Sequence, residues 1–171
     1  MIAGKGKQKG GSFEREVCKK LSLWVSNGKR DDIFWRSAMS GGRASVQFKR
    51  GNKNTTQVGD ISAIDPLGAP LIELAVIECK FYRDLKIAGA VVGNRGGLSA
   101  FWTTCATLAE RNKKLPVLIA KQNNTKPFIC LSGKGMNTFG TKGQALAWLP
   151  LAGGVQIMWL DKFLKNATPP K

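Results

Sequence analysis

Apolar residues recur along the chain at two different spacings, which predict helices near both ends and strands between them. The N-terminal pattern has intervals of three and four residues, the spacing of one helix face: it consists of Phe13, Val17, Leu21 and Trp24. Ser12 precedes this pattern and can cap a helix. We therefore expect a helix over residues 13–25, preceded by a flexible basic arm over residues 1–11 and followed by the breaker sequence SNGKRDD.

Short apolar runs bounded by Gly, Pro and Asn predict six strands and two further helices. The expected strands cover residues 33–38, 60–65, 71–81, 116–121, 126–132 and 154–160. The expected helices cover residues 98–113 and 161–166, and the segment ASVQF within the basic loop 39–59 can form a small hairpin. This order predicts one α/β domain over residues 12–165, with a central mixed β-sheet flanked by helices, and a tail over residues 166–171.

The charge balance is the unusual feature of the composition. The chain has 27 Lys and Arg against 11 Asp and Glu, a net charge of +16. Such an excess favours a polyanionic partner, first of all nucleic acid. An anionic membrane surface is the weaker alternative because the basic residues do not line one amphipathic helix. The third alternative is a charge that serves solubility alone. The sequence shows no secretory signal or membrane span.

Two residue types limit the chemistry. The chain has no histidine, which excludes Ser-His-Asp and Cys-His hydrolysis and histidine-ligated metal nucleases. Its four cysteines are widely separated and form no C-x-x-C pair, so buried, reduced thiols are expected instead of a zinc site. Any hydrolase here must therefore work with carboxylates, lysines and a hard metal such as Mg²⁺.

Two acids and a lysine provide that combination. Asp60 opens the second expected strand, and Glu78 lies near the end of the third. If these strands pair antiparallel across a short turn, both carboxylates can reach one Mg²⁺, and the backbone carbonyl of Cys79 is a further possible ligand. Lys80 projects from the same face as Glu78, one strand step of about 6.5–7 Å along. Its ammonium can orient an attacking water and balance charge on a phosphate.

An isolated E-x-K pair is weak support for an active site, because an exposed strand often carries such a pair. Here Glu78 follows an apolar run, a Gly-Asp pair precedes it, and the whole chain is basic. Gly59-Asp60 followed by Glu78-Cys79-Lys80 resembles the core motif of the PD-(D/E)xK nuclease superfamily, which implies a restriction-endonuclease-like fold. With KGGSFEREVCKKL (residues 9–21), RSAMSGG (36–42) and LPVLIAK (115–121), the sequence is similar to the archaeal-type Holliday junction resolvases.

This resemblance implies roles for individual residues. Asp60, Glu78 and Lys80 would be catalytic, with the two acids holding the metal. Glu14 would be a third catalytic acid near the metal. Glu16 lies two residues away and cannot share its helix face, so only one of the two can join the site, and the motif register favours Glu14.

The expected DNA-binding residues extend beyond the acids. By resemblance, Arg15 faces a phosphate, Arg36 and Ser40 contact the scissile strand, and Lys121 is a supporting base at the edge of the site. The link between Ser40 and Asp60 is longer than in the resolvases. Its basic residues are expected to bind DNA and to influence which substrate is cut: Arg43, Lys49, Arg50 and Lys53.

The sequence thus predicts a Mg²⁺-dependent DNA endonuclease, with Mn²⁺ as a possible substitute and one or two metals per site. The resemblance implies a homodimer that resolves four-way (Holliday) junctions in DNA recombination and repair. The expected location is the cytoplasm of a prokaryotic cell or a virus-infected host, without membrane or small-molecule cofactor. The alternatives are a nuclease of the same superfamily acting on duplex ends, forks or a sequence site, and a non-catalytic DNA-binding protein.

Overall fold

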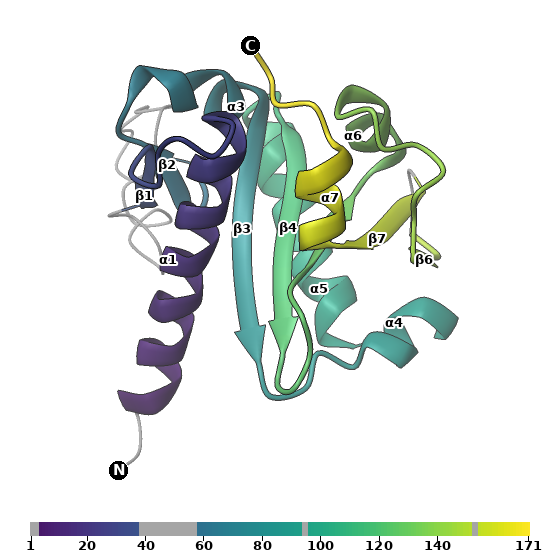
Figure 1. Ribbon diagram of the computed structural model, residues 1–171. Helices are drawn as coiled ribbons and strands as arrows, with labels where there is room; N and C mark the ends of the chain where they lie inside the picture. Colours follow the sequence, from purple (N-terminus) through teal and green to yellow (C-terminus); the bar gives the residue numbers. More distant parts are fainter. Residues whose placement is uncertain (1–3, 38–57, 94–95, 152–153) are drawn as a thin grey trace.

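A five-stranded mixed sheet forms the centre of the molecule. A computed structural model describes residues 4–37, 58–93, 96–151 and 154–171 (Figure 1). The strand order is β3-β4-β5-β7-β6. Only β3 and β4 pair parallel, and every other neighbouring pair is antiparallel. The strands are β3 (Ala75–Tyr82), β4 (Leu115–Gln122), β5 (Phe128–Leu131), β6 (Ala147–Leu149) and β7 (Val155–Trp159).

Helices cover both faces of this sheet, which confirms the predicted α/β class. One face packs against α1 (Gly4–Val25), α6 (Gly133–Thr138) and α7 (Leu160–Asn166) around a large apolar cluster. The other face packs against α4 (Ile87–Gly93) and α5 (Gly97–Arg111) around a second cluster. In Figure 1, α1 runs along the left of β3, α7 lies in front of the sheet beside β4, and α5 lies behind β3 and β4.

Helix α1 begins earlier than the sequence predicts. It starts at Gly4, so the expected flexible arm over residues 1–11 and the Ser12 cap are corrected for residues 4–11. Glycine is a poor helix former, and lysines four residues apart repel each other, but tertiary contacts hold the N-terminal part of α1. The Lys9 ammonium lies 4.0 Å from the centre of the Phe81 ring and donates a hydrogen bond to Asn123. Gly11 packs against the guanidinium of Arg36.

The segment that carries Asp60 reaches β3 in a different direction from the one predicted. Strands β1 (Phe34–Arg36) and β2 (Ile61–Ala63) form a separate antiparallel pair. The expected strand over residues 71–81 is helical at its start: η1 (Pro66–Gly68) and α3 (Ala69–Leu74) precede β3. This crossover makes Gly59 meet Ile77 in a parallel bridge, so the predicted antiparallel pairing of the Asp60 and Glu78 strands is wrong.

Other boundaries differ less. Helix α5 and strands β4, β5 and β7 lie where the apolar runs predict them, whereas α4, α6 and β6 were not predicted because each is short and weakly patterned. The C-terminal tail packs back on the domain, since Thr168 N donates to Phe139 O at 3.1 Å. The proposed ASVQF hairpin lies outside the described residues. Within the described segments, no helix combines the length and the hydrophobicity needed to cross a bilayer.

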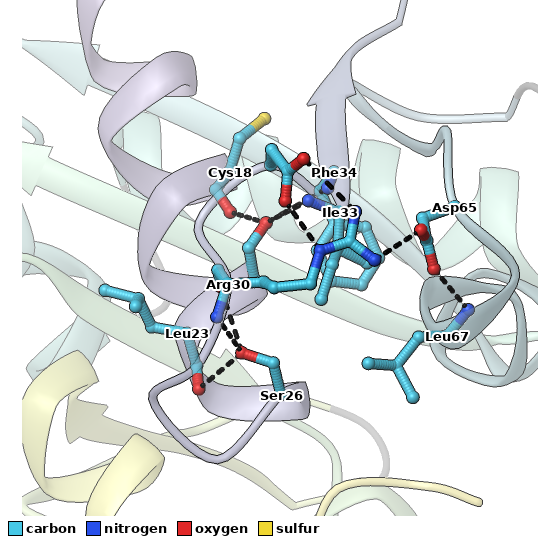
Figure 2. A network of polar contacts seen from close by, with 10 residues as sticks. Cys18, Leu23, Ser26, Arg30, Ile33, Phe34, Asp65 and Leu67 are labelled. Carbon is cyan, nitrogen blue, oxygen red and sulfur yellow. Dashed lines mark hydrogen bonds and ion pairs between the residues drawn. The ribbon is translucent and has the colours of Figure 1, made fainter.

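A polar network fixes the C-terminal end of α1 to β1 and η1 (Figure 2). The buried Ser22 hydroxyl donates to Cys18 O and accepts from the backbone N–H groups of Ile33 and Phe34 at 3.1 and 3.0 Å. Arg30 binds Asp32 and Asp65, and Asp65 also accepts from Leu67 N at 2.9 Å. These contacts set the entry into β1, the strand that positions Arg36.

Replacing Asp65 with Asn is expected to destabilise the protein slightly, in a pH-dependent way. The Leu67 N–H and the Arg30 guanidinium lower the pKa of Asp65 below its ordinary value. The charged carboxylate therefore contributes stability above the unfolded pKa of about 3.9, and this contribution is lost as pH falls through the folded pKa. Thermal melts of both forms should differ at pH 7 and converge near the acid limit. A difference that persists unchanged in acid would contradict this assignment.

Candidate active site

Strand β3 places its acid and its lysine on the face opposite helix α1. Side chains alternate along a strand, and the paired residues of β4 show which face is which. Glu78 is paired with Leu118 and Lys80 with Ala120, and both β4 residues belong to the apolar cluster beneath α5. Ile77 and Cys79 instead join the cluster beneath α1. The apolar neighbours thus anchor β3 and leave Glu78 and Lys80 together.

Gly59 brings Asp60 against the outer edge of β3. Its φ of +95° suits glycine, and a Cβ there would lie 2.7 Å from Ile77 O. The close approach allows Asp60 N to donate to Ile77 O at 2.8 Å, while Cys79 N donates to Asp60 Oδ2 at 2.8 Å. Ser37 N holds the Asp60 carbonyl at 2.8 Å from the other side. Asp60 is therefore fixed by backbone contacts on both sides.

Lys80 lies between the two carboxylates. Its Nζ is 2.7 Å from Glu78 Oε2 and 3.3 Å from Asp60 Oδ2. The three side chains are mostly shielded from solvent, with exposed fractions of 23% for Lys80, 14% for Glu78 and 10% for Asp60. The predicted set of Asp60, Glu78 and Lys80 is therefore brought together, although the strand pairing that was expected to do so is absent.

The side chains of Asp60, Glu78 and Lys80 together carry more negative than positive charge. Burial and the neighbouring Asp60 carboxylate raise the pKa of Glu78 despite the Lys80 ammonium. Burial alone would lower the pKa of Lys80, but Asp60 and Glu78 outweigh it and raise that pKa. Two carboxylates share one ammonium, so the ionised set has a formal charge of −1. A further cation would relieve the repulsion between the acids.

The donor atoms suit a hard divalent ion. The available ligands are carboxylate oxygens, and Mg²⁺ prefers a few such oxygens with water completing its shell. Because N–H and C=O of one strand residue point toward the same edge, the Cys79 carbonyl lies on the edge that its N–H shares with Asp60. Asp60, Glu78 and the Cys79 carbonyl are thus the residues that would hold Mg²⁺ or Mn²⁺.

Glu14 makes a different contact from the one its predicted role requires. Its carboxylate forms an ion pair with Arg36, and its side chain is 13% exposed. Helix α1 packs on the Ile77 and Cys79 face, away from the Glu78 side chain. Among the described residues, no three acidic or cysteine side chains gather into a metal-binding cluster. The structure therefore brings Glu14 to Arg36 and not to a three-acid metal centre.

The remaining predicted DNA-binding residues are dispersed. Lys121 lies on the α1 face, 3.5 Å from Glu16 and 5.3 Å from the centre of the Phe81 ring. Arg15 is exposed on α1, beside a shallow pocket that Asp31 and Asp32 also line. The structure does not bring Arg15 to the acids. The other predicted contacts lie outside the described residues: Ser40, Arg43, Lys49, Arg50 and Lys53.

Two groups of residues in and beside the site were not predicted from the sequence. Ser37 and Gly59 position Asp60 through the backbone, and only the Gly-Asp pair gave a signal for them. Lys9 and Phe81 were missed because the glycine-rich start of the chain was interpreted as an arm. The spacing of Lys9, Phe13 and Glu16 at helical intervals of four and three could have indicated the earlier start of the helix, but not the contact with Phe81.

Replacing Gly59 with Ala is expected to lower the free energy of unfolding by about 2–4 kcal/mol, combining left-handed backbone strain with overpacking. The added Cβ would press on Ile77 O and separate Asp60 from β3. Urea denaturation measures the loss. Gly28→Ala is the matched control, because Gly28 has a φ of +82° and nothing within 4 Å of its Cβ position. Equal losses for both variants would contradict the close approach at Gly59.

The fold and this site together define the class. The PD-(D/E)xK nucleases have an α/β domain with an Asp and a Glu-x-Lys motif at the edge of its sheet, and this chain shows the same arrangement. Residues 5–147 match the family described as "Phage putative PDDEXK endonuclease", and the chain therefore belongs to this family. Nucleases of this superfamily use divalent metal ions. No curated protein and no solved structure gives a significant match to the chain.

Proposed function

We propose that this protein is a Mg²⁺-dependent endonuclease that cuts branched DNA and resolves four-way junctions as a homodimer, with Mn²⁺ able to substitute. The observation that carries the nuclease activity is the Asp60, Glu78 and Lys80 set, in which two shielded carboxylates share one ammonium. The choice of a junction rests on the similarity of the motif order to the archaeal-type resolvases and on the net charge of +16.

The proposed reaction is hydrolysis of a phosphodiester bond. A water oxygen attacks the phosphorus, the bond to the 3′ oxygen breaks, and that oxygen takes up a proton, leaving 5′-phosphate and 3′-hydroxyl ends. A divalent ion bound here would activate the water and stabilise charge on the phosphate. Asp60 and Glu78 would hold the ion, and the Lys80 ammonium would orient the water and balance the phosphate charge.

The proposed dimer follows from the symmetry of the substrate. Resolution needs two incisions in opposed strands of the junction, and one copy of the chain carries one Asp60–Glu78 site. A two-fold homodimer presents two equivalent sites. The cytoplasm of a prokaryotic cell, including one infected by a phage, is the proposed place of action, since it holds both the DNA and reduced thiols such as the four buried cysteines.

Cleavage assays on three end-labelled substrates test this proposal. A synthetic four-way junction, a fork and a linear duplex are each incubated with the protein in Mg²⁺ or in EDTA. Paired nicks at symmetric positions of the junction, only with Mg²⁺, are expected. Cleavage of linear duplex alone would overturn the junction proposal. Tight binding without cleavage of any substrate, in Mg²⁺ and in Mn²⁺, would overturn the proposal that the protein is a nuclease.

A further inference from the structure

Two lysines from distant parts of the chain meet over one aromatic ring. Lys9 of α1 and Lys121 of β4 place their ammonium groups 4.0 and 5.3 Å from the centre of the Phe81 ring. Phe13 supports this ring at a centroid distance of 5.6 Å. Both lysines are half-buried, so their charged groups are held in place. Such cation–π contacts fix an ammonium without neutralising it.

The charges in this cluster are not balanced. Lys121 has one acidic neighbour, Glu16, at 3.5 Å. The contacts described for Lys9 are the amide oxygen of Asn123 and the Phe81 ring, neither of which carries a negative charge. Two ammonium groups near one ring repel each other, and Glu16 offsets only one of the two positive charges. The cluster therefore has one unbalanced positive charge, which an anion could neutralise.

The position of the cluster indicates which anion it meets. Phe81 directly follows Lys80 and is paired with Lys121, so the cluster adjoins the Asp60–Glu78 site across the end of β3. It faces the α1 side of the sheet, whereas Glu78 and Lys80 face the α5 side. A DNA backbone that passes this end of β3 would meet Glu78 on the α5 side of the sheet and the two lysines of the cluster on the α1 side.

We propose that Lys9 and Lys121, held over Phe81, form a second phosphate-binding point for the DNA strand that is cut, separate from the metal-binding acids. This inference rests on the proposed nuclease function and adds a positioning site to it. Asn123 and Phe81 orient Lys9, which lies in the N-terminal part of α1. The bound group is a phosphodiester of the DNA backbone, contacted without regard to base sequence.

The test measures junction binding in Ca²⁺, so that affinity is separated from cleavage. Lys9→Met and Lys121→Met keep the aliphatic chain over Phe81 and remove the charge. Each is expected to weaken binding about tenfold, and the double variant should reduce the slope of log affinity against log salt by about 2. Lys19→Met is the matched control, because exposed Lys19 lies on the same helix and pairs with Asp31 at 3.0 Å.

Uncharged methylphosphonate linkages, placed one at a time around the cut position, give the second readout. Wild-type protein should lose affinity at one position, and the double variant should be insensitive there. Lys9→Arg should bind more tightly than Lys9→Met, because it keeps the positive charge. If a Met variant fails to fold, the methylphosphonate measurements on the wild-type protein still test the inference. Loss no greater than that of Lys19→Met, or equal sensitivity at every linkage, would overturn the inference. Normal junction cleavage with either result would leave the proposed function intact.

Discussion

Replacement of Glu78 by Gln is expected to reduce DNA cleavage by about 10²–10³-fold or more, the range seen when one preorganised charge-stabilising group is lost. Gln keeps the size of the side chain but removes one of the two carboxylates that would hold the metal. The negative charge of the site also falls, so repulsion of the DNA phosphates decreases. Single-turnover cleavage of a labelled junction and gel-shift binding of the same DNA measure both effects.

Binding provides the internal control for this variant. Glu78→Gln should bind the junction as tightly as the wild type or more tightly, which shows that the fold is intact. Glu73→Gln is the matched control, since Glu73 is an exposed acid of α3 only five residues earlier. It should cut at the wild-type rate. Wild-type cleavage by Glu78→Gln would show that the active site has been assigned to the wrong residues.

Replacement of Lys80 by Met is expected to reduce cleavage by about 10²–10³-fold and to make stability depend on divalent ions. Without the ammonium, the Asp60 and Glu78 carboxylates face each other with no cation between them. The metal-free protein should lose about 1–3 kcal/mol of stability, less than a fully buried pair would lose because part of the site is exposed. Ca²⁺ should raise the melting temperature of this variant more than that of the wild type.

The control for charge is Lys134→Met, which removes an exposed lysine of α6. Its melting temperature and its response to Ca²⁺ should match those of the wild type. If Ca²⁺ stabilises Lys80→Met no more than it stabilises Lys134→Met, the two carboxylates do not form the cation site. The Asp60→Asn, Lys80→Met double variant should lose the added response to Ca²⁺, because it keeps one carboxylate, that of Glu78, where the single variant has two.

Local patterns predicted the parts of the fold whose residues are strongly apolar. Strand β4, helix α5 and the end of β3 lie where their sequences indicate, since burial on one or both faces leaves a clear pattern. The meeting of Asp60, Glu78 and Lys80 was also predicted, because acids are scarce in this basic chain and alternation on a strand fixes which side chains share a face.

The packing and pairing of helices and strands with one another could not be predicted from local sequence patterns. Pro70 lies in the first turn of α3, where its fixed φ favours a helix, and the crossover through α3 brings Asp60 to β3 in the parallel direction. In the N-terminal part of α1, Lys9 and Gly11 contact residues far along the chain, and local helix propensity does not reveal such contacts. Glu14 binds Arg36 because α1 packs on one particular face of the sheet. Each of these outcomes is decided by tertiary packing.

The most direct test of the Asp60–Glu78 metal site is a crystal soaked in Mn²⁺, with anomalous diffraction recorded for the metal. An anomalous peak is expected in contact with the carboxylates of both Asp60 and Glu78, and no such peak in a Glu78→Gln crystal treated identically. A peak elsewhere, or a Mn²⁺ ion that remains in place without Glu78, would contradict the assignment of these two acids as the metal-binding centre of the nuclease.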